Sequence, residues 1–135
     1  MLHQQTIHDM LNAPATKTIP SYVPTYLEQY YDKFLCEMHF PPSLKGYPYI
    51  KQALYHEHKN RRNLPALHKD IYREIAELYN TQICAVERCI SFCIQKAYER
   101  NPNGFRRFFP DCKKAPSNFC FLKTVSLYLD YSEEA

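Results

Sequence analysis

The side chains best suited to chemistry lie in one stretch, NTQICAVERCISFCIQKAYER, which covers residues 80–100. Its apolar residues recur every three or four positions, which predicts an amphipathic helix over about residues 82–99. Polar and charged groups on the opposite face of such a helix can hydrogen-bond to base edges or phosphates in a groove of DNA. The outward face is predicted to consist of Gln82, Cys84, Ala85, Arg88, Ser91, Phe92 and Gln95. The buried face is predicted to consist of Ile83, Val86, Ile90, Cys93, Ile94 and Ala97.

Two helices joined by a very short turn must position this face. The unit runs from about residue 70 to residue 100, and only Asn80 clearly favours the bend, because asparagine tolerates a left-handed turn at a helix end. Thr81 is then predicted to cap the second helix. Ala76 is small enough to let the second helix cross closely over the first. The pattern is typical of a helix-turn-helix, whose second helix enters the major groove, although an ordinary pair of packed helices would look similar.

Basic residues are concentrated around this unit. Residues 59–123 hold thirteen Lys or Arg and six Asp or Glu, a sum of +7, whereas the whole chain carries only +3. Phosphate neutralisation supplies much of the affinity of proteins for DNA, so the uneven charge favours a polyanion-binding surface. Each cation taken alone could equally be a solvated surface charge. The residues predicted to hold phosphates are Lys69, Arg73, Thr81, Lys113 and Lys114.

The chain as a whole is predicted to be all-α, a bundle of five or six helices that contains the helix-turn-helix. Apolar residues follow helical spacing through most of the chain, and no stretch alternates as a strand would. Residues 1–26 are predicted to be a poorly ordered extension, because prolines interrupt any helix there. Residues 27–135 then form one helical domain, whose last helix Ser117 is predicted to cap.

Other chemistries have little support in the sequence. Six cysteines without a secretory segment or a Cys-x-x-Cys pair are expected to be free thiols. His56, Glu57 and His58 would make a poor metal site, since residues two apart on a helix point to different sides. No glycine-rich phosphate loop or catalytic pair of acids is present. We therefore expect no enzyme activity, cofactor, metal or membrane span, and a cytoplasmic location.

From Leu27 onward the sequence resembles a known family, the C-terminal effector domain of the sporulation initiation regulator, stage zero sporulation protein A. The family pattern fits without a gap from Leu35 to Asn101. The resemblance implies a six-helix, winged-helix-like DNA-binding domain of endospore-forming bacteria that controls transcription at a short operator box, often as a tandem dimer. The matching stretches are LKGYPYIKQAL at 44–54, IYREIAELYNT at 71–81, VERCI at 86–90 and APSNFCFLKTVSLYL at 115–129.

The resemblance also implies roles for residues of the reading helix. Glu87 and Arg88 match the family's Val-Glu-Arg core, where Glu87 would accept from a cytosine amine and Arg88 would contact a guanine or a phosphate. The family has a serine, a base-reading arginine, an arginine and a histidine where this chain has Cys84, Ala85, Ser91 and Phe92. Losing one bidentate base contact, as at Ala85, costs about 1–3 kcal/mol of discrimination, so the selectivity of this chain is expected to differ from that of the family. The residues predicted to face bases are Gln82, Cys84, Ala85, Glu87, Arg88 and Ser91.

Two functional hypotheses follow. The family places a phosphate-accepting receiver domain before this one, and the roughly 26 residues available here are too few for it, so we expect no phosphorylation switch within this chain. The leading hypothesis is a sequence-specific transcriptional regulator that binds double-stranded DNA, as a homodimer where sites are in tandem. The alternative is a protein-interaction module, or an antagonist, that no longer reads DNA. The tyrosines available as a partner surface, or as the buried stripe of the first helix, are Tyr22, Tyr26, Tyr30 and Tyr31.

Overall fold

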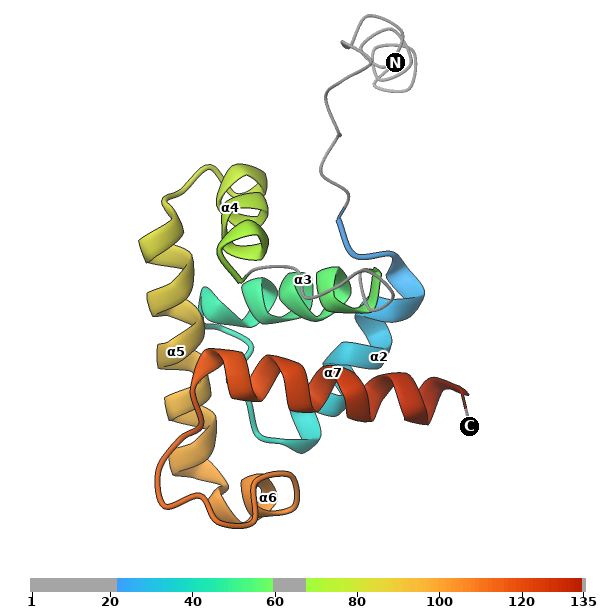
Figure 1. The fold of residues 1–135 in the computed structure, drawn as a ribbon, viewed down its shortest axis with the longest axis vertical. Coiled ribbons are helices and arrows are strands. Elements are labelled where there is room, and N and C mark those ends of the chain that lie inside the picture. Colours follow the sequence, from blue (N-terminus) through green and yellow to red (C-terminus); the bar gives the residue numbers. More distant parts are fainter. Residues whose placement is uncertain (1–21, 60–67, 135) are drawn as a thin grey trace, which may run out of the picture.

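The computed structural model describes residues 22–59 and 68–134, with side chains from 22–59 and 70–130, and this part of the chain is helical without strands (Figure 1). The predicted all-α fold is therefore confirmed. Residues 1–21, most of the predicted extension, lie outside the described part, and the first described helix begins at Thr25. The helices are α2 (Thr25–Glu37), α3 (Gly46–Lys59), α4 (His68–Leu78), α5 (Ile83–Arg100), α6 (Pro102–Arg106) and α7 (Asn118–Glu134).

Helix α5 forms one edge of the domain, and most of the other helices pack against it (Figure 1). Helix α3 lies at the centre, because it packs against α2, α4, α5 and α7. The fully buried side chains of Ile50, Ile90 and Leu122, from α3, α5 and α7, meet in one apolar core. Burial of these stripes supplies the main driving force that fixes the direction of α5.

The tyrosines of the N-terminal region divide into two groups. Tyr31 is buried in the core, and the Tyr30 hydroxyl donates to the carbonyl oxygen of Leu129 on α7 at 3.0 Å. By contrast, Tyr22 and Tyr26 are exposed. The core stripe therefore accounts for two of the four, and only Tyr22 and Tyr26 remain on the surface as a candidate partner site.

The cluster His56, Glu57 and His58 on α3 connects to different helices. His56 Nδ1 lies 2.9 Å from Glu74 Oε2 on α4. On α7, Lys123 Nζ donates to Glu57 at 2.9 Å, and Asp130 Oδ1 lies 2.9 Å from His58 Nδ1. Among the described residues, no three His, Cys, Asp or Glu side chains form a group that could hold a metal ion. These three residues therefore tie α3 to its neighbours.

His56 should make the stability of the domain depend on pH. Burial, with a smaller effect of the Lys59 charge, lowers the pKa of His56 to about 4 from its ordinary value of 6.5. The Glu74 carboxylate opposes this shift only weakly because it is about half exposed. A neutral imidazole also suits its contacts, since Gln52 Nε2 lies 3.3 Å from His56 Nε2 and can donate to it. The unfolded chain therefore takes up a proton at a higher pH than the folded one.

Because the unfolded chain is protonated first, the free energy of unfolding decreases as the pH falls. The contribution of His56 is complete above about pH 6.5 and is lost as the pH falls toward about 4, a total of about 3 kcal/mol. Urea unfolding across this range should show the loss in the wild type and a flatter profile in His56→Gln. The control is His39→Asn, which changes an exposed histidine and keeps a residue that tolerates the left-handed backbone there (φ 65). An unchanged pH profile in His56→Gln would contradict this assignment.

Candidate nucleic-acid interface

The corner between α4 and α5 is built on a left-handed residue, as predicted. Asn80 has φ 52, and the amide of Thr81 donates back to the carbonyl oxygen of Ala76 at 2.9 Å. Ala76 is buried at the crossing of the two helices. The prediction that Thr81 caps α5 is wrong, because Gln82 is the N-cap residue and makes no side-chain capping bond. The backbone bond to Ala76 places Thr81 inside the turn, one residue too early to cap.

Helix α5 has one buried and one exposed face. Val86, Ile90, Cys93, Ile94 and Ala97 are buried, as predicted. The prediction that Ile83 is buried is wrong, since it is 37% exposed. Ile83 is the first residue of α5, where the helix has only begun. Of the predicted outward face, Ala85 is half-buried and the other residues are exposed, as is Glu87; the exposed residues are Gln82, Cys84, Glu87, Arg88, Ser91, Phe92 and Gln95.

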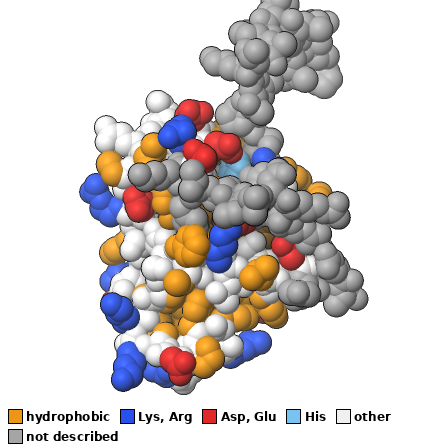
Figure 2. All heavy atoms as spheres, in the orientation of Figure 1, with side chains coloured by type: hydrophobic (Ala, Val, Ile, Leu, Met, Phe, Trp, Pro, Cys, Tyr) orange, Lys and Arg blue, Asp and Glu red, His pale blue; other side chains and the backbone are white. Residues whose placement is uncertain are grey.

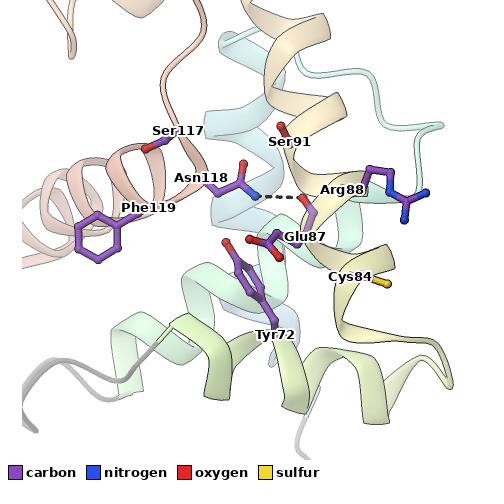
Figure 3. Close-up of a pocket in the computed structure, with 8 residues that line it drawn as sticks. All are labelled: Tyr72, Cys84, Glu87, Arg88, Ser91, Ser117, Asn118 and Phe119. Atoms are coloured by element: carbon purple, nitrogen blue, oxygen red, sulfur yellow. Dashed lines mark hydrogen bonds between the residues drawn. The ribbon is translucent and has the colours of Figure 1, made fainter.

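A groove of about 610 Å³ opens beside this exposed face (Figure 3). It lies between α5, the start of α7 and Tyr72 of α4. Four of the residues predicted to face bases line it, and Gln82 and Ala85 do not. The lining residues are Tyr72, Cys84, Glu87, Arg88, Ser91, Ser117, Asn118 and Phe119.

The start of α7 is fixed against α5 at this groove. The Ser117 hydroxyl accepts from the amide of Cys120 at 3.2 Å, which confirms the predicted cap. Asn118 Nδ2 donates to the carbonyl oxygen of Glu87 at 3.0 Å, the bond drawn in Figure 3. Phe119 is exposed at the rim. The two walls of the groove are therefore held together by a direct bond.

Sequence reasoning missed four lining residues, Tyr72, Ser117, Asn118 and Phe119, since it predicted Ser117 only as a helix cap. Burial raises the pKa of Tyr72, as does the Glu87 charge, while a hydrogen bond to Asn118 opposes the rise. The phenol therefore stays neutral and offers both a donor and an acceptor. They lie in the stretches IYREIAELYNT and APSNFCFLKTVSLYL, which resemble the family, but such a resemblance does not show that α4 and α7 meet at one groove.

Arg88 separates this groove from a second, apolar one. The second groove has a volume of about 310 Å³ and runs along the other side of α5. Phe92 is 51% exposed there, and Lys96 Nζ lies 5.3 Å from the centre of its ring. The guanidinium of Arg88 points away from α7 (Figure 3). The residues that line the second groove are Leu44, Lys45, Gly46, Arg88, Cys89 and Phe92.

The residues predicted to hold phosphates have different environments. Arg73 is exposed on α4 and pairs with Asp70 at 3.1 Å. Lys113 and Lys114 are exposed in the loop that precedes α7. Thr81 is half-buried in the corner, and the side chain of Lys69 lies outside the described part. Three of the five are therefore exposed cations, one on α4 and two in the loop before α7.

The described part of the chain is thus an all-α domain that exposes a polar face of one helix beside a groove. The chain belongs to the family described as the C-terminal domain of sporulation initiation factor Spo0A, which it matches over residues 32–129. This is a family of DNA-binding effector domains of transcription regulators, and it is not an enzyme family. None of the described helices has the length and apolar character needed to cross a membrane.

Proposed function

We propose that the chain is a sequence-specific transcriptional regulator in which α4 and α5 act as a helix-turn-helix and α5 enters the major groove. The observation that carries this proposal is the exposed face of α5, where the successive residues Glu87 and Arg88 both line the groove. A carboxylate accepts from cytosine and a guanidinium donates to guanine, so the pair can distinguish base pairs. Cys84 and Ser91 lie on the same groove and can contact neighbouring bases.

The remaining predicted residues take supporting roles in this proposal. Gln82, exposed at the tip of α5, can reach a base edge or a phosphate, and half-buried Ala85 leaves space for a thymine methyl. The phosphate contacts would come from Lys69, Arg73, Thr81, Lys113 and Lys114. Two chains would bind side by side where sites occur in tandem, in an endospore-forming bacterium.

One observation favours the alternative, a protein-interaction module. The second groove is apolar, and Phe92 is half exposed beside it where the family has a histidine. An aromatic side chain of this kind can anchor a protein partner. The two functions differ in their dependence on salt, because only DNA binding releases counterions from phosphates.

Binding to duplex DNA should therefore weaken steeply with salt. With about five phosphate contacts, the affinity measured by fluorescence anisotropy should fall roughly 10²–10³-fold between about 50 and 200 mM salt. Arg73→Ala should reduce the slope of log affinity against log salt by about 1. Lys33→Ala, an exposed lysine on α2, is the control and should leave the slope unchanged. No binding of duplex even at low salt would refute the proposal and favour the interaction module.

A further inference from the structure

A group of cations lies at the C-terminal end of α5. Residues 100–114 contain five Lys or Arg and one acid, Asp111, so the segment carries a formal charge of +4. All five basic side chains are exposed. We call this group the basic end; it consists of Arg100, Arg106, Arg107, Lys113 and Lys114.

The cations of the basic end are not neutralised by the residues that the structure describes. Within the described part of the chain, none of the five forms an ion pair, whereas cations near the core do. Lys51 pairs with Glu28 and Asp32, and Lys123 pairs with Glu57, all within 3.0 Å. Uncompensated charge on one surface creates a local field that attracts a polyanion.

Two arginines of the basic end, Arg106 and Arg107, lie at the end of α6, a short helix that is fixed to the core. Phe105 of α6 is completely buried, which fixes this short helix to the core. Arg106 Nη1 donates to Asn103 Oδ1 at 2.7 Å, and the Arg107 guanidinium lies 5.5 Å from the centre of the Phe108 ring. Their charges are therefore held near α6, and less side-chain freedom is lost when they bind.

The basic end and the base-facing groove lie along one helix. Helix α5 has 18 residues, a length of about 27 Å, and α6 follows at the end opposite α4 (Figure 1). Basic side chains are visible along this edge and at the lower end of the domain (Figure 2). The exposed stripe of α5 continues from Arg88 through Ser91 and Gln95 to Glu99.

The carboxylate of Glu99 does not block this path. Gln95 Nε2 donates to it at 3.2 Å, and Lys96 Nζ lies 3.4 Å away. The bond from Gln95 and the contact with Lys96 lower the pKa of Glu99, so the carboxylate is ionised, and the charge of Lys96 partly offsets it. A phosphate backbone that follows the stripe would therefore pass the Glu99 carboxylate, whose charge Lys96 partly offsets, and then reach the cations of the basic end.

We infer that the basic end is a second phosphate-binding surface and that the duplex lies lengthwise along α5. This inference rests on the proposed function. With one base pair for every 3.4 Å, a length of about 27 Å corresponds to about eight base pairs. The bound DNA therefore extends well beyond the bases that the groove can reach. A duplex is favoured over an acidic protein because the same polyanion can occupy the groove and the basic end.

The test compares two duplexes that carry the same central sequence, chosen as the one that the wild-type chain enriches from a random pool. The short duplex has about one helical turn centred on the bases that face Arg88, so it ends about five base pairs, or about 17 Å, further along. It therefore stops before α6, because Arg100 at the end of α5 lies about 18 Å from Arg88. The long duplex has about two and a half turns, with mixed-sequence flanks. The measured quantity is the slope of log affinity against log salt concentration. A longer duplex offers more positions at which the protein can bind, which raises the affinity but does not change this slope. Arg106→Gln/Arg107→Gln is compared with Lys33→Glu, which changes the charge by the same two units at an exposed position on α2.

On the long duplex, Arg106→Gln/Arg107→Gln should lower the slope by about 2 and weaken binding about tenfold or more. On the short duplex the same variant should behave as the wild type, and the control variant should match the wild type on both. A wild-type slope for Arg106→Gln/Arg107→Gln on the long duplex would overturn the inference, as would an equal loss on both duplexes. Failure of the wild type to bind or select any duplex would instead refute the proposed function.

Discussion

Replacing Arg88 with alanine should weaken binding to the selected duplex roughly 5–150-fold, which corresponds to about 1–3 kcal/mol for a lost bidentate base contact. Arg88 is exposed at the boundary of both grooves, so alanine removes the guanidinium without disturbing the core. The loss should be confined to one or two base pairs of the site. Anisotropy competition with duplexes changed at single positions measures this directly.

Two further variants separate the possible roles of Arg88. Arg88→Lys keeps the charge but loses the planar fork, so it should keep the salt dependence and lose the base preference. Lys33→Ala serves as the control for removing an exposed cation elsewhere. An equal loss of affinity against every base change would show that Arg88 contacts only phosphate and would refute the base-reading role.

Replacing Gly46 with alanine should destabilise the whole domain by about 3 kcal/mol. Gly46 begins α3 where this helix approaches α5 most closely. A Cβ atom there would lie 2.1 Å from the carbonyl oxygen of Cys89 and 2.8 Å from the Cβ atom of Cys93. Because the obstacle includes the backbone of α5, relief requires α3 and α5 to separate. Urea unfolding gives the change in the free energy of unfolding.

Gly104→Ala is the matched control for this substitution. A Cβ atom at Gly104 would meet the side chain of Asn101, which accepts from the Gly104 amide at 3.1 Å and can move aside. The expected cost is therefore about 1 kcal/mol, the value of a lost helix cap. Equal costs at the two glycines would contradict the close approach of α3 to α5.

Local sequence patterns predicted the elements and the corner well. Spacing alone identifies which face of α5 is buried, because burial of Val86 and Ile90 follows the helical repeat. The left-handed conformation of Asn80 could be predicted because few side chains tolerate it. The errors at Thr81 and Ile83 both arise at the start of α5, where the boundary of a helix depends on backbone bonds that no spacing reveals.

Contacts between distant segments could not be predicted in the same way. The groove depends on a bond between Asn118 and the backbone of Glu87, residues 31 positions apart. The roles of His56 and Glu57 likewise depend on partners from α4 and α7. A helical pattern fixes the direction in which a side chain points along its own helix, but the neighbour in that direction is decided by the packing of the whole domain.

The most direct test of the central claim, that α5 reads DNA sequence, is selection of bound duplexes from a random pool by the wild-type chain. We predict that a short sequence will be enriched and that Arg88→Ala will relax the preference at one or two of its positions. A bound pool with the same base composition at every position as the starting pool would contradict the claim.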